Sequence, residues 1–391
     1  MVQENEIRAQ DERWMKRALE LAERSVGVAS PNPAVGCVLV KDGTAVGEGL
    51  HEYDKKDHAE VVSLKMAGAA ARGATAYVTL EPCCTTGRTG PCTEALIRAK
   101  VARVVAATED PNPAVHGEGV ARLRDAGIAV ETGVGKAEAR VLNDGFARFI
   151  RTKLPFVNLK AGLSLDGRIA PAPGRARRGA PVFLTGEKAR EQVQAMRHRA
   201  DAVITGINTV LEDDPMLTDR SGLPRRRPLL RVVLDSGLRI PMDSKLVRST
   251  QEDLLIFCTV APTQRQRTLE ALGVRVERVE CAELGGGDGT GQSKGSRPSG
   301  VSLREVLQRL GEMDILSAML EAGGQVNSAA LSGGHVDKLT LFYAPLLLGP
   351  GAVPLVQEAM TGSAWRGAPT IACVGQDVRV DAYLRNPWEE S

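Results

Sequence analysis

The sequence His58-Ala59-Glu60 is followed by Glu81-Pro82-Cys83 and, after eight further residues, by Cys92. Imidazole and thiolate are ligands that zinc prefers, and a catalytic zinc has three protein ligands and one position open to water. Zinc lowers the pKa of a bound water from ~15.7 towards ~7. A Glu two residues after the His can reach such a water and move its protons. The stretch therefore predicts a catalytic zinc site with His58, Cys83 and Cys92 as ligands and Glu60 beside them.

A structural zinc with four protein ligands is the alternative for the same stretch. Cys84 is the one residue that could complete a closed tetrahedral site, but adjacent cysteines rarely bind one ion together. An open, catalytic site is therefore the favoured interpretation. The other four cysteines stand in apolar or ordinary surroundings and are predicted to serve packing; they are Cys37, Cys258, Cys281 and Cys373.

The residues around this stretch alternate between helix and strand patterns. We expect helices over 11–26, 58–69, 93–100 and 139–150, and strands over 35–40, 45–50, 75–80 and 101–107, with a hairpin turn at Asp42-Gly43. Cys92 then lies at a helix N-terminus, which stabilises a thiolate. This alternation predicts an α/β layered sheet with the metal at the helix ends.

The composition is that of a globular protein with two domains. The chain has 391 residues, 43% of them hydrophobic and 25% charged. A net charge of +2 argues against binding of nucleic acid or a membrane surface by the whole protein. The N-terminus lacks the apolar core of a signal peptide, no apolar run reaches the ~18–20 residues needed to span a bilayer, and seven cysteines do not suggest a disulfide framework. We expect a soluble, cytoplasmic protein.

Six short motifs in the first 113 residues stand in an order found in one enzyme family. They are Pro31-Asn32-Pro33-Ala34-Val35-Gly36, Gly47-Glu48-Gly49-Leu50-His51, His58-Ala59-Glu60-Val61, Thr79-Leu80-Glu81-Pro82-Cys83, Gly87-Arg88-Thr89-Gly90-Pro91-Cys92 and Asp110-Pro111-Asn112-Pro113. The chain resembles the bifunctional deaminase–reductase of bacterial riboflavin biosynthesis. The eight residues between the two cysteines favour this family, because nucleobase deaminases of other kinds have two residues there.

For the first half, the resemblance implies a cytidine-deaminase-like three-layer α/β/α domain over residues 1–152. It implies zinc on His58, Cys83 and Cys92, Glu60 as the catalytic proton shuttle, and substrate contacts from Asn32, His51, Arg88, Asp110 and Asn112. Arg88 on a glycine-flanked loop suits a phosphate, and Asp110 and Asn112 can hydrogen-bond the edge of a pyrimidine.

The second half begins after a short basic linker, Arg151-Thr152-Lys153-Leu154-Pro155. We expect strands over 156–160, 201–206, 229–235 and 253–259, helices over 188–199 and 264–272, and a flexible Gly/Ser-rich insertion over 285–300. A strand over 315–320 then leads through Gly323-Gly324 into a helix. Such a junction suits a pyrophosphate, although Gly-Gly turns more often serve only chain reversal. No G-x-G-x-x-G follows a strand, which disfavours a Rossmann domain.

The second half resembles the reductase part of the same family, through motifs that include Ser164-Leu165-Asp166-Gly167-Arg168, Asp213-Asp214-Pro215-Met216-Leu217-Thr218 and Glu321-Ala322-Gly323. The resemblance implies a dihydrofolate-reductase-like α/β domain over residues 153–391 that uses NADPH. It implies cofactor contacts from Leu163, Phe183, Thr209, Asp213, Ser236, Gly323, Gly324, Gln325, Val326, Asn327, Ser328 and Ala329, and substrate contacts from Arg197, Leu217, Arg220 and Glu321. Lys160 and Asp213 are the catalytic candidates for polarising the ribose oxygen and managing its proton, while the cofactor carries the hydride.

The chain departs from the family pattern at two places beside these sites. Cys84-Thr85-Thr86 stands where the family usually has Ser-His-His, and Pro181-Val182-Phe183 stands where it usually has Ser-x-Trp. Phe183 can still stack on a cofactor, whereas Pro181 offers no hydroxyl group.

The predicted function is a two-step reaction of riboflavin biosynthesis. A phosphoribosyl-aminopyrimidine would be deaminated hydrolytically, and its ribosyl group would then be reduced to ribityl by NADPH. One alternative is a nucleic-acid or nucleoside deaminase with an accessory domain, which the net charge, the 3% aromatic content and the cysteine spacing disfavour. Another is a monofunctional protein with one half acting as a scaffold. The resemblance also implies a homo-oligomer, and the net charge favours a protein that binds neither nucleic acid nor membrane.

Overall fold

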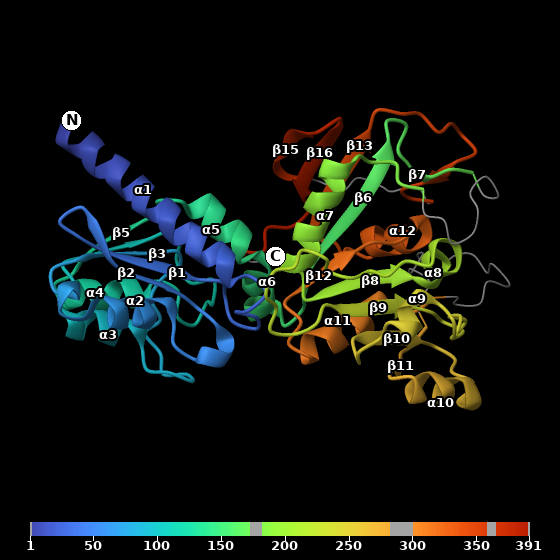
Figure 1. Cartoon of the computed structure of the whole chain (residues 1–391), viewed down its shortest axis with the longest axis horizontal. Coiled ribbons are helices and arrows are strands. Elements are labelled where there is room, and N and C mark those ends of the chain that lie inside the picture. The colour runs from blue at the N-terminus through green and yellow to red at the C-terminus, as the bar shows by residue number, and fades with distance from the viewer. Residues whose placement is uncertain (1, 173–181, 282–299, 358–364, 390–391) are drawn as a thin grey trace, which may run out of the picture. The chain divides into compact units, whose positions relative to one another are not determined.

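A computed structural model of the chain describes residues 2–172, 182–281, 300–357 and 365–389. Nearly all of the insertion expected over 285–300, and Pro181, therefore lie outside the described residues. The chain divides into two compact units, one formed by residues 1–153 and 224–227 and the other by residues 154–223 and 228–391 (Figure 1). Among the helices of the described residues, none has the length and apolar character needed to cross a membrane.

The first unit is a five-stranded sheet covered by helices on both faces (Figure 1). The strand order is β2-β1-β3-β4-β5; β1 is antiparallel to both β2 and β3, and β3, β4 and β5 are parallel. The strands are β1 (Gly36–Lys41), β2 (Thr44–Leu50), β3 (Thr75–Val78), β4 (Arg103–Ala106) and β5 (Ala129–Thr132). The helices are α1 (Val2–Ser25), η1 (Tyr53–Lys55), α2 (Ala59–Ala67), η2 (Gly68–Ala71), α3 (Cys92–Ala99), α4 (Glu118–Asp125), α5 (Lys136–Leu142) and α6 (Asp144–Thr152).

Glycines in β1 and β2 set how closely two helices approach this sheet. A Cβ atom on Gly36 would lie 2.1 Å from the carbonyl oxygen of Ala18 in α1. A Cβ atom on Gly49 would lie 2.2 Å from the carbonyl oxygen of Ala59, the first residue of α2. Gly49 pairs with Cys37, the neighbour of Gly36, so the two missing side chains belong to opposite faces of the sheet. The glycines thus place α1 and α2 on opposite faces and fix the start of α2 beside β2.

Two expectations for the first unit meet different outcomes. The Asp42-Gly43 turn is confirmed, since both residues have positive φ angles, 49° and 73°. The single helix over 139–150 is wrong, because α5 ends at Leu142 and α6 begins at Asp144. The buried Asn143 side chain lies between them, where its Oδ1 accepts from Ala34 N at 2.8 Å and its Nδ2 donates to Ala34 O at 3.0 Å. These bonds to a distant loop favour a break over a continuous helix.

The second unit is built on a nine-stranded sheet of order β11-β10-β9-β8-β12-β6-β13-β16-β15. In this order, the strands from β11 to β13 are parallel to one another. β16 is antiparallel to β13, and the edge strand β15 is antiparallel to β16. The strands are β6 (Phe156–Ser164), β8 (Ala202–Gly206), β9 (Leu230–Leu234), β10 (Leu254–Cys258), β11 (Arg275–Arg278), β12 (Ser317–Leu320), β13 (Lys338–Ala344), β15 (Arg366–Val374) and β16 (Asp377–Tyr383), with a separate pair of β7 (Arg168–Ala170) and β14 (Val353–Pro354). The helices are α7 (Glu187–Arg199), α8 (Ile207–Asp213), α9 (Lys245–Arg248), α10 (Thr263–Ala271), α11 (Leu303–Glu312) and α12 (Gly324–Ser332).

Alternating side chains of the parallel strands feed two hydrophobic cores, one on each face of this sheet. In β10, Leu255 and Phe257 join the core that contains residues of α11 and α12. Leu254 and Ile256 join the core that contains residues of α7, α8, α9 and α10. The second unit is therefore an α/β domain, as the resemblance implies, with a hydrophobic core on each face of its sheet.

The cysteines outside the metal-binding stretch fall into two groups. Cys37 and Cys258 are buried, in agreement with the packing role predicted for them. Cys281 and Cys373 are exposed, so the packing role predicted for these two is wrong. Cys373 lies in β15, an edge strand that is exposed along nearly its whole length, and an apolar sequence neighbourhood there does not produce burial.

Candidate functional site

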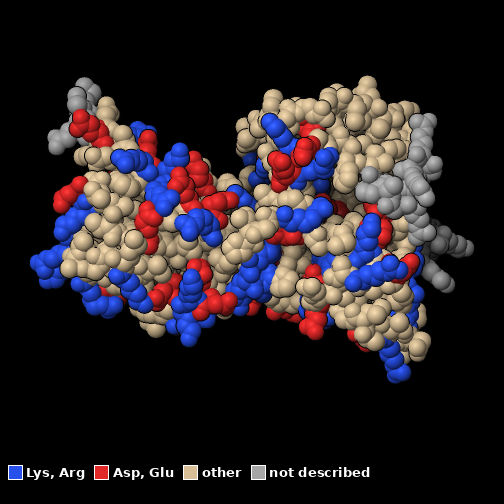
Figure 2. All heavy atoms as spheres, in the orientation of Figure 1, with Lys and Arg blue, Asp and Glu red and all other residues tan. Residues whose placement is uncertain are grey.

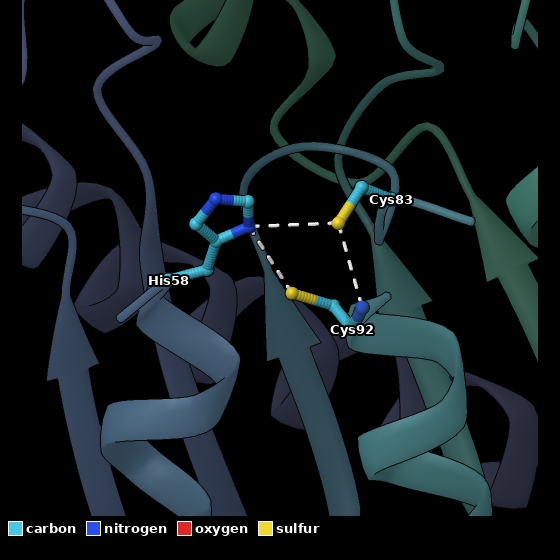
Figure 3. A group of neighbouring side chains, drawn as sticks. All are labelled: His58, Cys83 and Cys92. Carbon is cyan, nitrogen blue, oxygen red and sulfur yellow. Dashed lines mark hydrogen bonds between the residues drawn. The ribbon is translucent and has the colours of Figure 1, made fainter. Parts of the chain in front are cut away.

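The three predicted zinc ligands converge at the N-terminal ends of two helices (Figure 3). His58 directly precedes α2, Cys92 is the first residue of α3, and Cys83 lies in the loop that follows β3. His58 Nδ1 lies 3.5 Å from Cys83 Sγ and 3.3 Å from Cys92 Sγ, and the three ligand atoms lie within 4.8 Å of one another. In a tetrahedral zinc site with bonds of about 2.0–2.3 Å, ligand atoms are roughly 3.3–3.8 Å apart. The donor set and its spacing fit zinc.

The surroundings of the two cysteines favour a thiolate at Cys83. Hydrogen bonding from the Cys92 side chain, assisted by His58 and by the backbone N–H of Cys92 at 3.4 Å, lowers the pKa of the Cys83 thiol to about 4. The same contact raises the pKa of the Cys92 thiol, because the neighbouring sulfur already carries the negative charge. The opposite shifts describe one proton shared by two sulfurs, and a metal that binds thiolates releases such a proton.

Glu60 lies in the first turn of α2 and is almost completely buried, with 3% of its surface exposed. Burial raises the pKa of its carboxyl to about 7, and the negative charge of Cys83 acts in the same direction. A carboxyl that both holds and releases a proton near neutral pH suits a general acid and base. Its position two residues after His58 places it beside the predicted metal.

His51 and Asn32 form a hydrogen-bonded pair next to His58. The rings of His51 and His58 meet edge to face with centroids 5.1 Å apart. His51 Nδ1 lies 2.9 Å from the carbonyl oxygen of Asp57, which can only accept, so Nδ1 carries the proton. His51 Nε2 then accepts from Asn32 Nδ2 at 3.0 Å. Burial lowers the pKa of His51, which agrees with a neutral ring that is fixed in one tautomer.

Asp110 and Asn112 belong to a loop that Glu81 holds in place. The buried carboxylate of Glu81 accepts three backbone hydrogen bonds, from Asp110 at 2.9 Å, Gly117 at 3.0 Å and Val120 at 3.0 Å. Burial raises the pKa of Asp110 to about 6, and the charges of Glu81 and Cys83 add to the shift. Asp110 therefore lies near enough to Cys83 for the charge of that cysteine to affect the pKa of the Asp110 carboxyl. Sequence reasoning gave Glu81 no role, although it stands two residues before Cys83.

Arg88 is exposed on the loop between the two cysteines and turns to the helical turn η1. Its guanidinium carbon lies 4.0 Å from the centroid of the Tyr53 ring, and its Nη1 donates to the carbonyl oxygen of Tyr53 at 3.1 Å. Tyr53 follows His51 by two residues, so Arg88 is anchored at the border of the group formed by His51, Asn32 and His58. Sequence reasoning did not single out Tyr53.

In the second unit, four of the residues predicted to contact NADPH lie at or near the carboxyl ends of neighbouring strands. Leu163 lies near the carboxyl end of β6, Thr209 follows β8, Ser236 follows β9 and Gly323 follows β12. These strands are adjacent and parallel, in the order β9-β8-β12-β6. Ligands of open α/β sheets bind outside the carboxyl ends of the strands. Gly323 precedes α12 with nothing within 4 Å of a Cβ atom built on it, so the backbone N–H groups at the start of this helix have room for a phosphate.

Three predicted residues of the reductase meet in a partly buried ion-pair group. Glu321 Oε2 lies 3.2 Å from Lys160 Nζ, and Glu321 Oε1 accepts from Arg197 Nε at 2.7 Å. Although burial opposes ionisation, the charges of Lys160 and Arg197 hold the pKa of Glu321 at about 2. Arg197 also donates to the carbonyl oxygen of Thr218 at 3.1 Å, next to the buried Leu217.

Other predicted reductase residues are not brought into this group. Within the described residues, Asp213 forms no hydrogen bond or ion pair with Lys160, and burial raises its pKa. The Arg220 side chain is exposed, and Phe183 is 64% exposed with Arg190 over its ring at 5.1 Å. Two predicted cofactor residues of α12 have internal partners instead: Asn327 Nδ2 donates to Ala322 O, and Ser328 Oγ donates to Gly324 O. These two side chains hold the start of the helix. Gln325 and Ala329 are exposed and Val326 is partly exposed.

Two protein families match the chain, one in each half. Residues 8–108 match the zinc-binding region of cytidine and deoxycytidylate deaminases, and residues 155–371 match the RibD C-terminal domain. The first match contains all three predicted zinc ligands and Glu60. The second contains Lys160, Arg197 and Glu321.

Curated relatives and solved structures extend this similarity to nearly the whole chain. The riboflavin biosynthesis protein RibD of Aquifex aeolicus is 39% identical over 88% of this chain and 90% of its own length, and that of Escherichia coli is 42% identical with the same coverage. A structure of Acinetobacter baumannii RibD has 37% identity and a TM-score of 0.78, covering 96% of this chain and 99% of its own. The diaminohydroxyphosphoribosylaminopyrimidine deaminase/5-amino-6-(5-phosphoribosylamino)uracil reductase of Thermotoga maritima has 31% identity and a TM-score of 0.77 with equal coverage.

Proposed function

The chain belongs to the RibD family of riboflavin-biosynthesis enzymes, and from this premise we propose which of its residues carry the family's two activities. It is a bifunctional enzyme, with a zinc-binding deaminase domain followed by an NADPH-dependent reductase domain. We assign the deaminase to residues 1–152 and the reductase to residues 153–391. The name of the Thermotoga maritima relative supplies the substrates: a diaminohydroxyphosphoribosylaminopyrimidine and then an aminouracil with the same phosphoribosyl group.

In the deaminase, His58, Cys83 and Cys92 would hold the zinc ion, which supplies a water with a lowered pKa. Hydrolytic deamination breaks the bond from a pyrimidine carbon to its amino nitrogen, forms a bond from that carbon to the water oxygen and releases ammonia. The Glu60 carboxylate takes a proton from the water and gives it to the departing nitrogen. The burial that raises the pKa of Glu60 to about 7 supports both halves of this task.

The remaining residues of the first site orient the substrate. Asn32 and His51 are fixed by their mutual hydrogen bond, and Asp110 and Asn112 are fixed by the loop that Glu81 holds. We assign these four residues to the aminopyrimidine ring. Arg88, exposed at the border of the site, is assigned to the phosphate.

In the reductase, conversion of a ribosyl to a ribityl group adds a hydride to the anomeric carbon and a proton to the ring oxygen. NADPH supplies the hydride. Lys160 Nζ, held by Glu321 at 3.2 Å, is the proposed proton donor to the oxygen, and Glu321 fixes its position. Asp213 is the proposed second proton carrier, and Arg197, Arg220 and Leu217 are assigned to the phosphoribosyl end of the substrate. The cofactor would lie at the carboxyl ends of β6, β8, β9 and β12.

We further infer a cytoplasmic homo-oligomer that acts on small molecules and not on nucleic acid. All seven cysteines are free, which suits a reducing compartment. On the face shown in Figure 2, acidic and basic side chains of the first unit are interspersed, without a broad basic field that would suit a phosphate backbone. Self-association rests on the family alone, and a sedimentation velocity run that gave only the monomer mass would contradict it.

The single observation that carries the deaminase assignment is the cluster of His58, Cys83 and Cys92 with the buried Glu60 beside it. Glu60→Gln keeps the size of the side chain and removes the proton carrier. We expect deaminase activity to fall roughly 10²- to 10⁴-fold while zinc content and reductase activity stay at the wild-type level. Activities would be measured separately, each with its own substrate, and zinc by elemental analysis.

Glu94→Gln is the matched control, because Glu94 lies in α3 and its ion-pair partner among the described residues is Arg122 at the surface. Full deaminase activity in a zinc-loaded Glu60→Gln enzyme would remove Glu60 from the mechanism. Deamination of single-stranded nucleic acid by the wild-type enzyme would instead favour the alternative of a nucleic-acid deaminase with an accessory domain. Absence of one of the two wild-type activities would favour the monofunctional alternative.

A further inference from the structure

Four residues from the second half of the sequence, 224–227, are part of the first compact unit. The backbone N–H of Arg226 donates to Gly27 O at 2.9 Å. Its side chain donates through Nε to Asp54 Oδ1 at 2.9 Å and through Nη1 to Ser30 O at 3.2 Å. Arg227 Nη2 donates to Ser30 Oγ at 3.1 Å. The segment thus delivers arginine side chains to the deaminase unit.

Two guanidinium groups lie over one tyrosine ring. The guanidinium carbon of Arg226 is 4.1 Å from the centroid of the Tyr53 ring, and that of Arg88 is 4.0 Å from the same centroid. The two carbons are therefore within about 8 Å of each other. Like charges at this separation repel, and among the described residues the carboxylate paired with either of them is that of Asp54, whose side chain is 73% exposed. The pair is suited to a further anion.

This arginine pair stands beside the residues assigned to the aminopyrimidine. Tyr53 follows His51 by two residues, and Ser30 precedes Asn32 by two. Two residues span at most about 7 Å of chain. Arg226 therefore contacts both segments that carry the hydrogen-bonded pair of His51 and Asn32, and through His51 it is linked to the ring of His58.

Both arginines keep donors for a ligand. Among its interactions with the described residues, Arg88 uses Nη1, and Arg226 uses Nε and Nη1, which leaves Nη2 of Arg226 unengaged. A guanidinium offers a planar fork of donors that matches phosphate oxygens. Contact with the Tyr53 ring restrains both side chains, so less side-chain freedom is lost when an anion binds.

We propose that Arg226 is a substrate-binding residue of the deaminase and that it binds the phosphate together with Arg88. The inference rests on the proposed function, because the substrate is taken to carry a phosphoribosyl group. With the pyrimidine at the metal cluster, the phosphate lies one ribose away, towards the border of the site. Arg88 and Arg226 occupy that border. The deaminase site is then completed by a residue from the reductase half of the sequence.

A purely structural role for Arg226 would have a different signature. If the side chain only anchored residues 224–227 to the first unit, its loss would affect every substrate of the deaminase to the same extent. If it binds the phosphate, its loss matters only when the phosphate is present. The test therefore compares the phosphorylated aminopyrimidine with the same compound after removal of its phosphate.

Arg226→Ala in the full-length, zinc-loaded enzyme is expected to raise the deaminase KM for the phosphorylated substrate roughly 10- to 100-fold. The kcat stays within about twofold, and kcat/KM for the dephosphorylated compound stays unchanged. Arg226→Lys keeps the charge and loses the planar fork, so it recovers part of the affinity. Lys55→Ala is the control, because Lys55 lies in the same helical turn and pairs with Glu52.

An equal loss for both substrates, or no loss for either, would overturn the proposal. A wild-type enzyme that deaminates neither substrate would contradict the proposed function itself. The reductase activity of each variant reports whether the rest of the protein is intact.

Discussion

Glu321 is a carboxylate with little exposed surface that stays ionised because two cations flank it. Burial alone would raise its pKa, but Lys160 and Arg197 hold it at about 2, well below the ordinary value of 4.5. A carboxyl with a depressed pKa in the folded state stabilises the fold above its unfolded pKa. This contribution is lost as the pH falls from about 4.5 towards 2.

Glu321→Gln should therefore lower the free energy of unfolding of the second unit at pH 7 by about 3 kcal/mol, because it removes the negative charge that lies between two poorly exposed cations. The difference between variant and wild type should shrink as the pH falls from 4.5 towards 2, where the wild-type carboxyl also loses its charge. Urea unfolding at a series of pH values measures both effects. Glu312→Gln, which removes a 66% exposed carboxylate paired with Arg309, is the control. A difference that is constant with pH would contradict the role of these two cations.

Single residues were predictable where a motif marks them, and their partners were not. The family resemblance names Lys160, Arg197 and Glu321 one by one, but these residues lie up to 161 positions apart, and no spacing rule joins them. Glu81 was missed because a buried carboxylate that accepts three backbone N–H groups has no sequence signature beyond its place next to Pro82-Cys83. Arg226 was missed because a run of arginines resembles a solvated loop.

Helix α2 illustrates how an element positions chemistry. Its first turn carries Glu60, and His58 directly precedes it, so its distance from β2 sets where both residues lie. Gly49 in β2 permits that distance, since a Cβ atom there would meet Ala59 O at 2.2 Å and Ser63 N at 2.7 Å. Backbone atoms cannot rotate away as side chains do, so the helix itself would have to move.

Gly49→Ala is accordingly expected to lower the free energy of unfolding of the first unit by at least 1–3 kcal/mol and to weaken zinc binding. Zinc content after dialysis against a weak chelator, together with thermal unfolding, measures the two effects. Gly43→Ala tests the same substitution where a Cβ atom has nothing within 4 Å, and the positive φ of 73° alone should cost about 1 kcal/mol without loss of zinc. Equal zinc affinity in the two variants would show that α2 does not depend on this contact.

Most elements were predictable where hydrophobic periodicity is strong. The strands β1, β8, β9 and β10 are short apolar runs, and the sequence places each within about one residue. The break at Asn143 was missed because a bond to Ala34, 109 positions away, produces it. The pair β15 and β16 was missed because β15 is exposed at nearly every position and shows no alternation of apolar and polar residues.

At the scale of the whole molecule, the two units have separate hydrophobic cores. Met15, Val38 and Val105 belong to a core of the first unit, and the two cores of the second unit contain only its own residues. The metal cluster lies entirely within the first unit. Stability that zinc supplies is therefore local to the deaminase.

Removal of zinc with a strong chelator should abolish deaminase activity and leave reductase activity within about twofold of its starting value, since binding free energy stabilises only the unit that contains the site. Thermal unfolding followed by calorimetry should show one transition shifted downwards and the other unchanged. Addition of zinc should restore the deaminase. Parallel loss of both activities, without recovery, would show that the units do not unfold independently.

The placement of residues 224–227 means that the chain passes from one unit to the other three times, after Lys153, after Leu223 and after Arg227. A single cut after Lys153 therefore does not yield the whole first unit, because the fragment lacks the hydrogen bonds that Arg226 and Arg227 make to Gly27, Ser30 and Asp54. If a gene is designed to express the enzyme as two polypeptides divided after Lys153, the first polypeptide also loses residues 224–227 of its own unit. The second part of the gene therefore encodes four residues, 224–227, that belong to the first unit of the folded protein.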